Sequence, residues 1–292
     1  MSYLNFRTLP LLFALSLILA ITSLLSFESQ AMMRALNTAA TGMASQETLV
    51  NTISNNIANA NTTGFKRERA QFEDLMYETQ VEAGARSSSN TVYNVGMQIG
   101  SGSKVSAVRK EFAVGSQLMT NRPWDLMITG QGFFGIVMND GTVKYTRDGS
   151  FSVNYQGEIV NRRGQKLFPG FQIPPNTLST AISPDGKIEA YVKNQREPIV
   201  VGNIPTFMFV NPTGLKSLGG NLFQDTRSSG AAIQTLPGQE NAGSIAQGVL
   251  EASNVSVMTE MTGLIKAQRA YEMNSKVMGI ADQMLQTVNN IR

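Results

Sequence analysis

The chain has 292 residues, of which 42% are hydrophobic and 15% are charged, so it can bury a core while its surface stays poor in charge. It contains no cysteine and no histidine, which excludes disulfides, the common zinc sites and most nucleophile–base pairs. The formal net charge is only +3, and the densest basic run, residues 66–69, includes an acid and is typical of a solvated face. Because the basic residues form no stripe, nucleic-acid binding is not expected.

Residues 1–31 are set apart by an uncharged apolar run at 9–25, which is followed by small residues at Ser29 and Ala31. This arrangement is typical of a secretory signal peptide. The run is slightly short for a membrane-spanning helix, which needs about 20 apolar residues. A third interpretation is a translation start assigned too early, with Met32 or Met33 as the true start. On each interpretation we expect residues 1–31 to lie outside the fold.

Residues 33–64 are predicted to form a long helix and its cap. Five apolar residues follow heptad-related spacing on one face: Leu36, Met43, Val50, Ile53 and Ile57. Abundant Asn, Thr and Ser residues weaken the intrinsic propensity, so this helix should be marginal alone and form when packed. The Asn-, Thr- and Gly-rich cluster at 59–64 favours a cap and a turn.

Residues 65–115 are predicted to be an extended arm. Its stretch 78–103 is rich in Ser, Gly and Asn, lacks helical periodicity and is too long for an ordinary loop. We interpret this stretch as a connector that is either ordered by neighbours or flexible. Residues 226–249 are again polar, glycine-rich and poor in strand signals, so we expect them to return the chain to the last helix.

Residues 116–225 are predicted to form a compact antiparallel β-domain. Short apolar runs such as 133–138 alternate with turn dipeptides, which are Asp140-Gly141, Asp148-Gly149 and Asp185-Gly186. Prolines lie at the breaks between the runs. With long helices at both ends, this predicts an α+β chain in which the helices pair as a coiled coil and glycine/serine-rich arms flank the β-domain.

Residues 250–292 are predicted to form a second helix, which at about 40 residues would be about 60 Å long. Its heptad seam comprises Met261, Leu264, Gln268, Tyr271, Ser275, Met278, Asp282 and Leu285. The seam has two alternating sets of positions. The set with Leu264, Tyr271, Met278 and Leu285 stays apolar, whereas the set that starts at Met261 continues with polar residues. A domain of this size cannot cover so long a helix. We therefore expect the helix, and its polar seam positions in particular, to contact other copies of the chain.

Three patterns resemble catalytic or binding motifs but lack their context. The glycines at 130–135 match the dinucleotide-binding spacing, yet a strand is predicted after them where that site needs a helix. Residues 101–104 match S-x-x-K without its companion motifs. Asp125, Asp148 and Asp185 could pair as glycosidase carboxylates, but two of them precede glycine, where turns favour aspartate. We predict no catalytic residue, no cofactor and no metal site.

Four blocks near the two ends resemble the N- and C-terminal signatures of bacterial flagellar rod and hook proteins. These blocks are residues 35–43, 54–66, 250–255 and 268–276. Residues 125–134 and 145–151 are similar to the middle blocks of the same family, so the resemblance covers essentially all of 33–292. It implies assembly roles for Asn59, Asn61, Thr63, Gly64 and Phe65. In the last helix it implies them for Gln268, Arg269, Tyr271, Glu272, Asn274 and Ser275, and the heptad seam adds Met261, Leu264, Met278 and Leu285.

The resemblance implies a structural protein without enzymatic activity. Members of the family stack helically into a hollow axial shaft, with the terminal helices in an inner tube and the β-domain outside. Within the family, the polar stretch 77–102 and the 260 residues of 33–292 (292 − 32) resemble the distal rod. Such a subunit would assemble with itself, proximal rod proteins, the hook protein and the P-ring and L-ring proteins. It would leave through the flagellar type III export apparatus and span the periplasm to the outer membrane.

Two alternatives stay open at this point. One is another axial subunit of the proximal rod or hook. The other is a Sec-secreted carbohydrate-active or adhesive β-protein, which the signal-like start and the aspartates would favour. Rod proteins normally carry no cleaved signal, so under the rod interpretation residues 1–31 are best explained by a start assigned too early.

Overall fold

The computed structural model describes residues 9–88, 91–193, 195–239 and 241–290. The chain divides into two compact units, each of which is described by itself. The first unit comprises the residues up to 51, residues 70–108 and the residues from 262 onward. The second comprises residues 52–69 and 109–261. Both long helices pass from one unit into the other.

Helix α1 spans Leu9–Ala58. It confirms the predicted first helix, and its last residue, Ala58, directly precedes the cluster at 59–64 that was predicted as its cap. Residues 9–31 continue α1 without a break, and the expectation that residues 1–31 lie outside the fold stays a prediction. The helix is continuous for a local reason: Pro10 falls in the first turn, where proline is tolerated, and no glycine or proline follows until Gly42. Residues 1–8 lie outside the described part of the chain.

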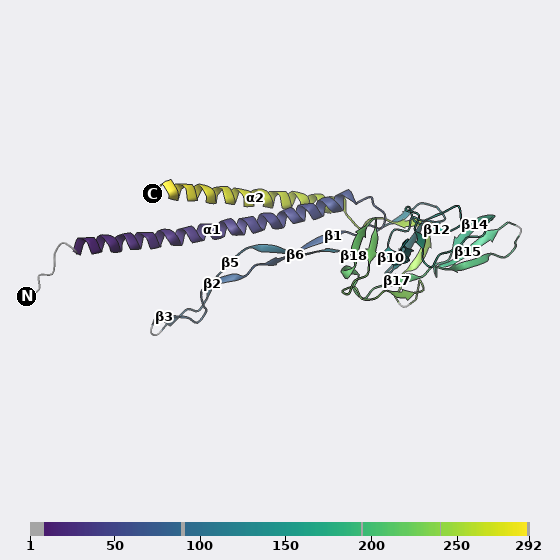
Figure 1. Cartoon of the computed structure of the whole chain (residues 1–292), viewed down its shortest axis with the longest axis horizontal. Helices are drawn as coiled ribbons and strands as arrows, with labels where there is room; N and C mark the ends of the chain where they lie inside the picture. The colour runs from purple at the N-terminus through teal and green to yellow at the C-terminus, as the bar shows by residue number, and fades with distance from the viewer. Residues whose placement is uncertain (1–8, 89–90, 194, 240, 291–292) are drawn as a thin grey trace, which may run out of the picture. The chain divides into compact units, whose positions relative to one another are not determined.

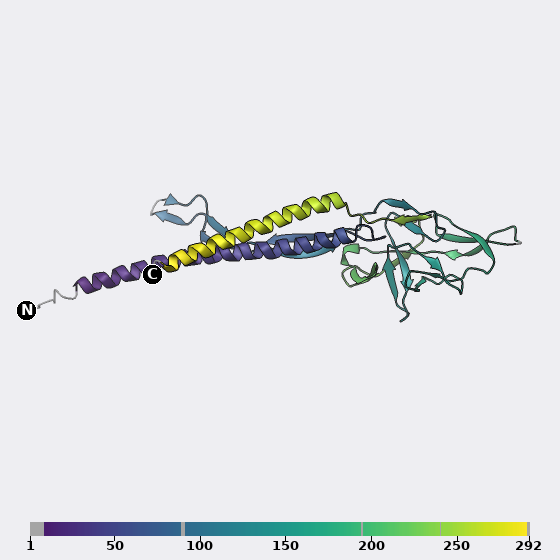
Figure 2. The same ribbon diagram turned by 90° about the horizontal axis from the view of Figure 1, so that it is seen from above.

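Helix α2 spans Val257–Asn290 and lies beside α1 in the first unit, as both views show (Figures 1 and 2). A Cβ atom built on Gly42 of α1 would stand 2.8 Å from the side-chain nitrogen of Asn274 on α2. The two backbones therefore approach closely here, because glycine carries no side chain. Among the described residues, neither helix has the length and apolarity that crossing a membrane requires.

The packed face of α2 differs by one residue from the predicted seam. Ala267 and Ala281 are buried, with exposed fractions of 2% and 6%, and Asn274 between them is half-buried. The predicted polar positions Gln268 and Ser275 are exposed instead. The predicted apolar set of the seam is half-buried at Leu264, Met278 and Leu285, but Tyr271 is exposed. Small residues occupy the packed face because they allow the helices to approach, whereas a hydrophobicity pattern gives alanine little weight.

The packed face of α1 is likewise lined by small residues. Ala39 and Ser45 are buried in the first unit, and Ile53 is buried in the second. The other predicted positions, Leu36, Met43, Val50 and Ile57, are half-buried. The role of the predicted face in helix pairing stays a prediction.

The segment predicted as an extended arm is a run of antiparallel strand pairs. The pairs are β1 (Glu68–Asp74) with β6 (Ser103–Lys110), β2 (Tyr77–Val81) with β5 (Met97–Gly100), and β3 (Arg86–Ser88) with β4 (Thr91–Val92). In the first unit, the Ser45 hydroxyl of α1 donates to the Ser103 carbonyl at 3.2 Å. Arg34 of α1 also pairs with Glu78 at 2.9 Å. The stretch 78–103 is thus largely paired with itself.

The second unit is built on a nine-stranded sheet whose order is β11-β12-β13-β9-β10-β19-β18, with β17 joining β9 and β20. The strands are β9 (Phe133–Val137), β10 (Val143–Thr146), β11 (Ser152–Val153), β12 (Ile159–Val160), β13 (Lys166–Leu167), β17 (Thr206–Met208), β18 (Lys216–Gly219), β19 (Leu222–Gln224) and β20 (Ile233–Thr235). All of its pairings are antiparallel, as predicted. Strand β9 begins within the glycine motif at 130–135, where a dinucleotide site needs a helix, so the dinucleotide-binding interpretation fails.

Smaller sheets complete this unit. They are β14 (Thr177–Ile182) with β15 (Lys187–Val192) and β16 (Ile199–Asn203), β8 (Leu126–Thr129) with β21 (Ser244–Gln247), and β7 (Gln117–Met119) with β22 (Val249–Glu251). A 3₁₀ turn, η1, spans Pro212–Gly214. The expectation of a strand-poor segment at 226–249 is wrong, because β20, β21 and the start of β22 lie there. Partner strands from distant parts of the chain stabilise them despite weak local signals.

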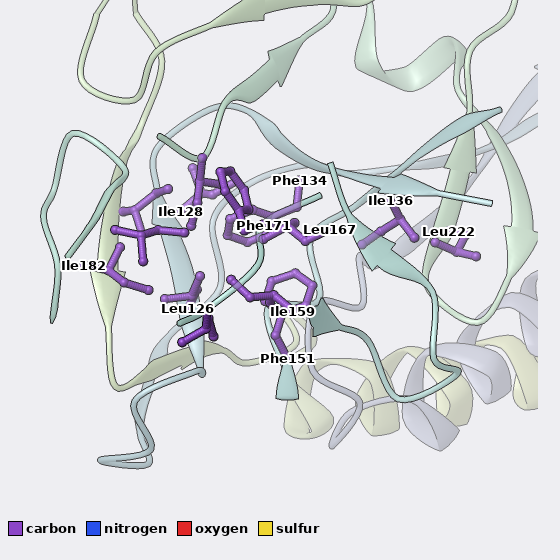
Figure 3. Packing of buried hydrophobic residues seen from close by; sticks show 14 residues of the cluster. Leu126, Ile128, Phe134, Ile136, Phe151, Ile159, Leu167, Phe171, Ile182 and Leu222 are labelled. Carbon is purple, nitrogen blue, oxygen red and sulfur yellow. The ribbon is translucent and has the colours of Figure 1, made fainter. Parts of the chain in front are cut away.

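Two apolar clusters lie on opposite faces of β9. Figure 3 shows the larger one, which includes Leu126, Ile128, Phe134, Ile136, Phe151, Ile159, Leu167, Phe171, Ile182 and Leu222. The smaller cluster is aromatic and comprises Phe133, Tyr145, Phe207, Phe209 and Phe223. Alternation along β9 sends Phe133 and Phe134 to different clusters. Rings in the aromatic cluster meet edge-on, as for Phe133 and Phe209 with centroids 5.5 Å apart.

Candidate assembly site

The turn after α1 is fixed by close contact with the β-domain. Gly64 has a φ of +68°, and a Cβ atom there would lie 2.6 Å from the backbone nitrogen of Asp148. The Gly64 amide donates to the carbonyl of Glu251 at 2.8 Å. Only glycine combines this backbone conformation with such an approach. The predicted assembly residue Gly64 therefore joins the N-terminal segment to both the β-domain and the C-terminal segment.

The neighbouring residue Thr63 adds a second anchor. Its hydroxyl donates to the Asp148 carboxylate at 3.0 Å, and its carbonyl accepts from the side chain of Asn221 at 2.9 Å. The same carboxylate oxygen accepts from the Ser150 amide and hydroxyl at 3.1 and 2.7 Å. Asp148 was predicted as a hairpin-turn residue. Instead, it organises the loop between β10 and β11, which do not pair with each other.

A buried ion cluster lies beside this anchor. The Lys66 ammonium donates to the Glu251 carboxylate at 2.5 Å and to the Ala113 carbonyl at 2.6 Å. The other oxygen of Glu251 lies 3.4 Å from the guanidinium of Arg147. The Gly115 amide also donates to Glu251, at 3.0 Å. Exposed fractions are 1% for Lys66, 1% for Glu251 and 3% for Arg147, so none of the three charges reaches bulk solvent.

Burial is the main electrostatic influence on the two cations. It lowers the pKa of Lys66 and that of Arg147, while Glu251 opposes the shift in both cases. Two cations share one carboxylate here. The Arg147 guanidinium gains further compensation from the carbonyls of Ile128 and Gly130, at 3.4 and 2.8 Å. Buried charges are tolerated only when such partners are present, so removing Glu251 should be costly.

A second polar group joins the ends of the two helices inside the second unit. The Asn56 amide donates to the Glu260 carboxylate at 3.2 Å, and Arg67 pairs with the other Glu260 oxygen at 2.6 Å. Asn56 also exchanges two 2.8 Å hydrogen bonds with the backbone of Glu68. Burial pulls the pKa of Arg67 down, but hydrogen bonds and charge from Glu260 and Glu111 outweigh it and raise the pKa.

Asn254 completes the connection. Its side-chain oxygen accepts from the Arg67 amide at 2.7 Å, and its nitrogen donates to the carbonyls of Glu111 and Ala113 at 2.8 and 3.2 Å. Three chain segments therefore meet at one side chain. We call the residues Asn56, Lys66, Arg67, Arg147, Glu251, Asn254 and Glu260 the terminal junction.

The predicted N-terminal assembly residues fall into two groups. Thr63, Gly64 and Phe65 border the terminal junction, and Phe65 is buried beneath Lys110, whose ammonium lies 5.0 Å from the ring centroid. Asn59 caps α1, since its amide donates to the Asn55 carbonyl at 3.0 Å. Asn61, by contrast, is exposed.

The predicted C-terminal residues lie away from the junction, along α2. Exposed members are Met261, Gln268, Arg269, Tyr271, Glu272 and Ser275, and half-buried members are Leu264, Asn274, Met278 and Leu285. The predicted residues at 59–65 and those along α2 therefore lie in different parts of the structure. On α2, Asn274 faces Gly42 of α1, which is the neighbour of the predicted residue Met43.

The sequence did not single out the junction's charged residues. The run at 66–69 was interpreted as a solvated face, which is wrong for the fully buried Lys66. Arg147 and Glu251 lie inside the blocks that resemble the family, next to apolar residues. This position was the one sequence feature that could have indicated their burial. Their ion-pair partners could not be predicted from the sequence, because each partner lies far away in the chain. In the described part of the chain, no three His, Cys, Asp or Glu residues are placed to hold a metal ion.

Three family models match this chain, all of them describing flagellar rod or hook proteins. Residues 36–66 match the flagella basal body rod protein family. Residues 127–190 match the D1 domain of the flagellar hook protein FlgE/F/G group, and residues 246–291 match the C-terminal region of flagellar basal body rod FlgEFG proteins. Lys66, Arg147 and Glu251 each come from a different one of these regions, so the buried ion cluster joins all three.

Curated relatives show which member of the rod and hook family this chain is similar to. Flagellar basal-body rod protein FlgG of Borreliella burgdorferi is 45% identical over 263 residues, covering 89% of this chain and 99% of the relative. FlgG of Caulobacter vibrioides is 46% identical over 261 residues, covering 89% and 100%, and FlgG of Bacillus subtilis is 34% identical over 266 residues with the same coverage. The chain belongs to the FlgG family of flagellar basal-body rod proteins, which is a structural and not an enzymatic family. This assignment replaces the carbohydrate-active interpretation.

Proposed function

We propose that this chain is a structural subunit of the flagellar distal rod, and that its copies assemble helically into the hollow shaft that passes motor torque to the hook. The observation that carries the self-assembly is the outer face of α2. It exposes Met258, Met261, Ile265, Met273, Val277, Ile280 and Met284, each with at least 44% of its surface accessible. Exposed apolar residues along a helix of a charge-poor chain favour contact with further copies.

Within the shaft, we propose that α1 and α2 pair as a coiled coil in an inner tube. The small residues on their packed faces and the close approach at Gly42 and Asn274 support this pairing. The exposed residues Gln268 and Ser275 would then contact neighbouring subunits. Their polarity would fit them to specific partners, as single polar seam residues do in coiled coils.

The terminal junction would hold the β-domain to the ends of both helices while torque passes along the shaft. Its ion pairs tie residues before the β-domain to residues after it, through Lys66 with Glu251 and Arg67 with Glu260. These pairs are charge-assisted, and the first is fully buried. The β-domain would therefore move with the helix ends rather than swing independently.

The proposed partners are further copies of the chain, the proximal rod and hook proteins, the P-ring and L-ring proteins, and the type III export apparatus. The proposed location is the basal body from the periplasm to the outer membrane. Helices of weak intrinsic propensity suit passage through a narrow export channel, because they gain stability when packed. Residues 1–31 would be explained by a start assigned too early, which mass spectrometry of the protein's N-terminus tests. A mature N-terminus at Met32 that requires an active Sec pathway would contradict this explanation.

Truncation after Met261 tests self-assembly. It removes the part of α2 in the first unit and leaves Glu251, Asn254 and Glu260 in place. We expect the truncated protein to keep a folded β-domain, seen by fluorescence of its single tryptophan, Trp124, but to lose polymerisation and to fail to restore motility. A motile strain carrying only the truncated protein would contradict the proposal.

Deleting residues 78–100, which include the β3–β4 pair and most of the β2–β5 pair, tests whether the chain is a distal rod protein or another axial subunit. The Leu75 amide donates to the Gly102 carbonyl at 2.9 Å, so a short turn can replace residues 78–100 without disturbing the β1–β6 pair. If this segment sets straight, rigid packing, the deletion should give a more flexible, hook-like assembly in electron micrographs. A straight rod of unchanged stiffness would show that the segment has no such role.

A further inference from the structure

A cavity of about 280 Å³ opens beside the aromatic cluster of the second unit. Its apolar walls include Phe112, Phe133, Met208 and Phe209, and Gln131 lies among its lining residues. Arg147 also forms part of the lining and is the one charged residue there. Apolar walls with a single cation are typical of sites that bind small molecules or side chains bearing one acidic group.

The Arg147 guanidinium is incompletely satisfied where it borders this cavity. Its two terminal nitrogens donate to Glu251 and to the carbonyls of Ile128 and Gly130. In the described part of the chain, its Nε atom has no hydrogen-bond partner, and it is itself buried from solvent. Because buried N–H groups are nearly always paired in folded proteins, this unpaired one leaves part of the guanidinium charge without compensation.

Charge complementarity indicates the kind of ligand. Lys66 and Arg147 contribute two positive charges to the buried ion cluster, and Glu251 contributes one negative charge. The cluster therefore carries an excess of one positive charge beside the cavity. A carboxylate held in the cavity would offset this charge at close range. The guanidinium carbon also lies 5.3 Å from the centroid of the Phe133 ring, so an apolar stem would pack beside the cation.

We propose that this cavity binds a carboxylate carried on an apolar or aromatic stem, with the stem among the phenylalanines and the carboxylate toward Arg147. Two sources share this chemistry. One is a free small carboxylate, and the other is an acidic side chain of a neighbouring copy, which rests on the proposed self-assembly. Binding by the isolated chain does not depend on assembly, so it can be tested even if that proposal fails.

The test uses 3-phenylpropionate as probe and 3-phenylpropanol as its uncharged match, each titrated into the full-length monomer by calorimetry. Attraction between the charges should favour the carboxylate by about tenfold or more. Equal binding of both compounds, or no binding of either, would overturn the proposal.

Variants of Gln131 locate the probe. Its side chain is exposed at the cavity, and the contacts shown for it in the fold are backbone ones, so substitution should not unfold the chain. Gln131→Glu places a negative charge at the cavity without changing size, and Gln131→Trp obstructs it. Both should weaken 3-phenylpropionate binding at least severalfold, whereas Tyr155→Glu on an exposed residue should not. Unchanged affinity in both Gln131 variants would place any binding elsewhere and refute the site.

Polymerisation in the presence of saturating 3-phenylpropionate distinguishes the two sources. If a neighbouring copy normally supplies the carboxylate, the probe competes with it, and wild-type assembly slows while assembly of Gln131→Trp no longer responds to the probe. If the natural ligand is a free carboxylate, assembly proceeds at an unchanged rate. Either result retains a carboxylate site and names its source.

Discussion

The ammonium of Lys66 lies 2.5 Å from the carboxylate of Glu251, although 185 residues separate them in the chain. Lys66 follows the first helix, Glu251 precedes the last, and the whole β-domain lies between them in sequence. Both side chains are buried. The pair can therefore form only when the two terminal segments and the β-domain have folded together.

Removing the shared carboxylate should destabilise the second unit strongly. In Glu251→Gln, Lys66 and Arg147 stay buried without their anion, and breaking such a pair typically costs about 3–5 kcal/mol. Urea unfolding followed by Trp124 fluorescence measures the change. The matched control is Glu158→Gln, whose carboxylate pairs with the exposed Lys166 at 2.6 Å and should cost far less. Equal losses in the two variants would contradict a special role for the buried pair.

Asn56 should not tolerate a charge. Asn56→Asp would set a second carboxylate beside Glu260 and remove the donor to the Glu68 carbonyl, so we expect a loss of at least about 2 kcal/mol. Asn55→Asp is the control, because Asn55 is exposed and its side-chain oxygen only accepts from Asn59, which aspartate can still do. Thermal unfolding of both variants, read by circular dichroism, should show a large shift only at position 56. Similar melting temperatures would argue against a tightly packed junction.

Substitution by alanine should destabilise the protein far more at Gly64 than at another glycine of similar conformation. Gly64→Ala combines left-handed strain of about 1–2 kcal/mol with a Cβ atom 2.6 Å from the Asp148 backbone, so its cost should exceed the strain alone. Gly84 also has a positive φ, but nothing lies within 4 Å of a Cβ atom there. Gly84→Ala should therefore show the strain only. Comparable melting temperatures for the two variants would mean that the backbone around Gly64 shifts to accommodate the Cβ atom.

Substitutions at two adjacent residues on α2 distinguish packing within the subunit from contact between subunits. Ala267→Leu should overpack the buried face against α1 and cost about 1–3 kcal/mol in the isolated chain. Gln268→Leu should leave monomer stability nearly unchanged, because Gln268 is exposed, yet it should impair rod assembly if its polarity is fitted to neighbours. Denaturation of monomers and electron microscopy of rods check the two effects. Normal rods from Gln268→Leu and from Ser275→Leu would show that the polar positions carry no such information.

Stability in alkaline solution should reveal the buried ammonium of Lys66. Burial lowers its pKa below the ordinary value of 10.5, so between the folded pKa and 10.5 the unfolded chain binds more protons than the folded one. The free energy of unfolding contributed by Lys66 therefore rises with pH through this window. Tyr145 acts oppositely, because burial raises its pKa above 10.0.

Comparison with Lys66→Met isolates the lysine, because Tyr145 is present in both proteins. We expect the free energy of unfolding of the wild type to increase, relative to this variant, as pH rises toward 10.5. The measurement is urea unfolding at several alkaline pH values. A difference that stays constant with pH would indicate that Lys66 titrates normally.

The sequence by itself determined the helices, the antiparallel β-domain and the family. Heptad spacing over 33–57 and period-two alternation after residue 104 are local patterns, and local patterns predict local structure. The signature blocks are also contiguous, so the family could be recognised without knowing which residues touch. Strands β20 and β21 were missed, because their local signals are weak and their partners lie elsewhere in the chain.

Only the tertiary structure decided which residues those patterns bring together. The packed face of α2 passes through Ala267 rather than Gln268, because close helix approach selects small side chains that carry little hydrophobic signal. Lys66, Arg147 and Glu251 come from three distant segments and become partners only when the fold is complete. A buried charge is acceptable only beside its counter-charge, and that pairing is a property of the folded chain, not of any stretch of its sequence.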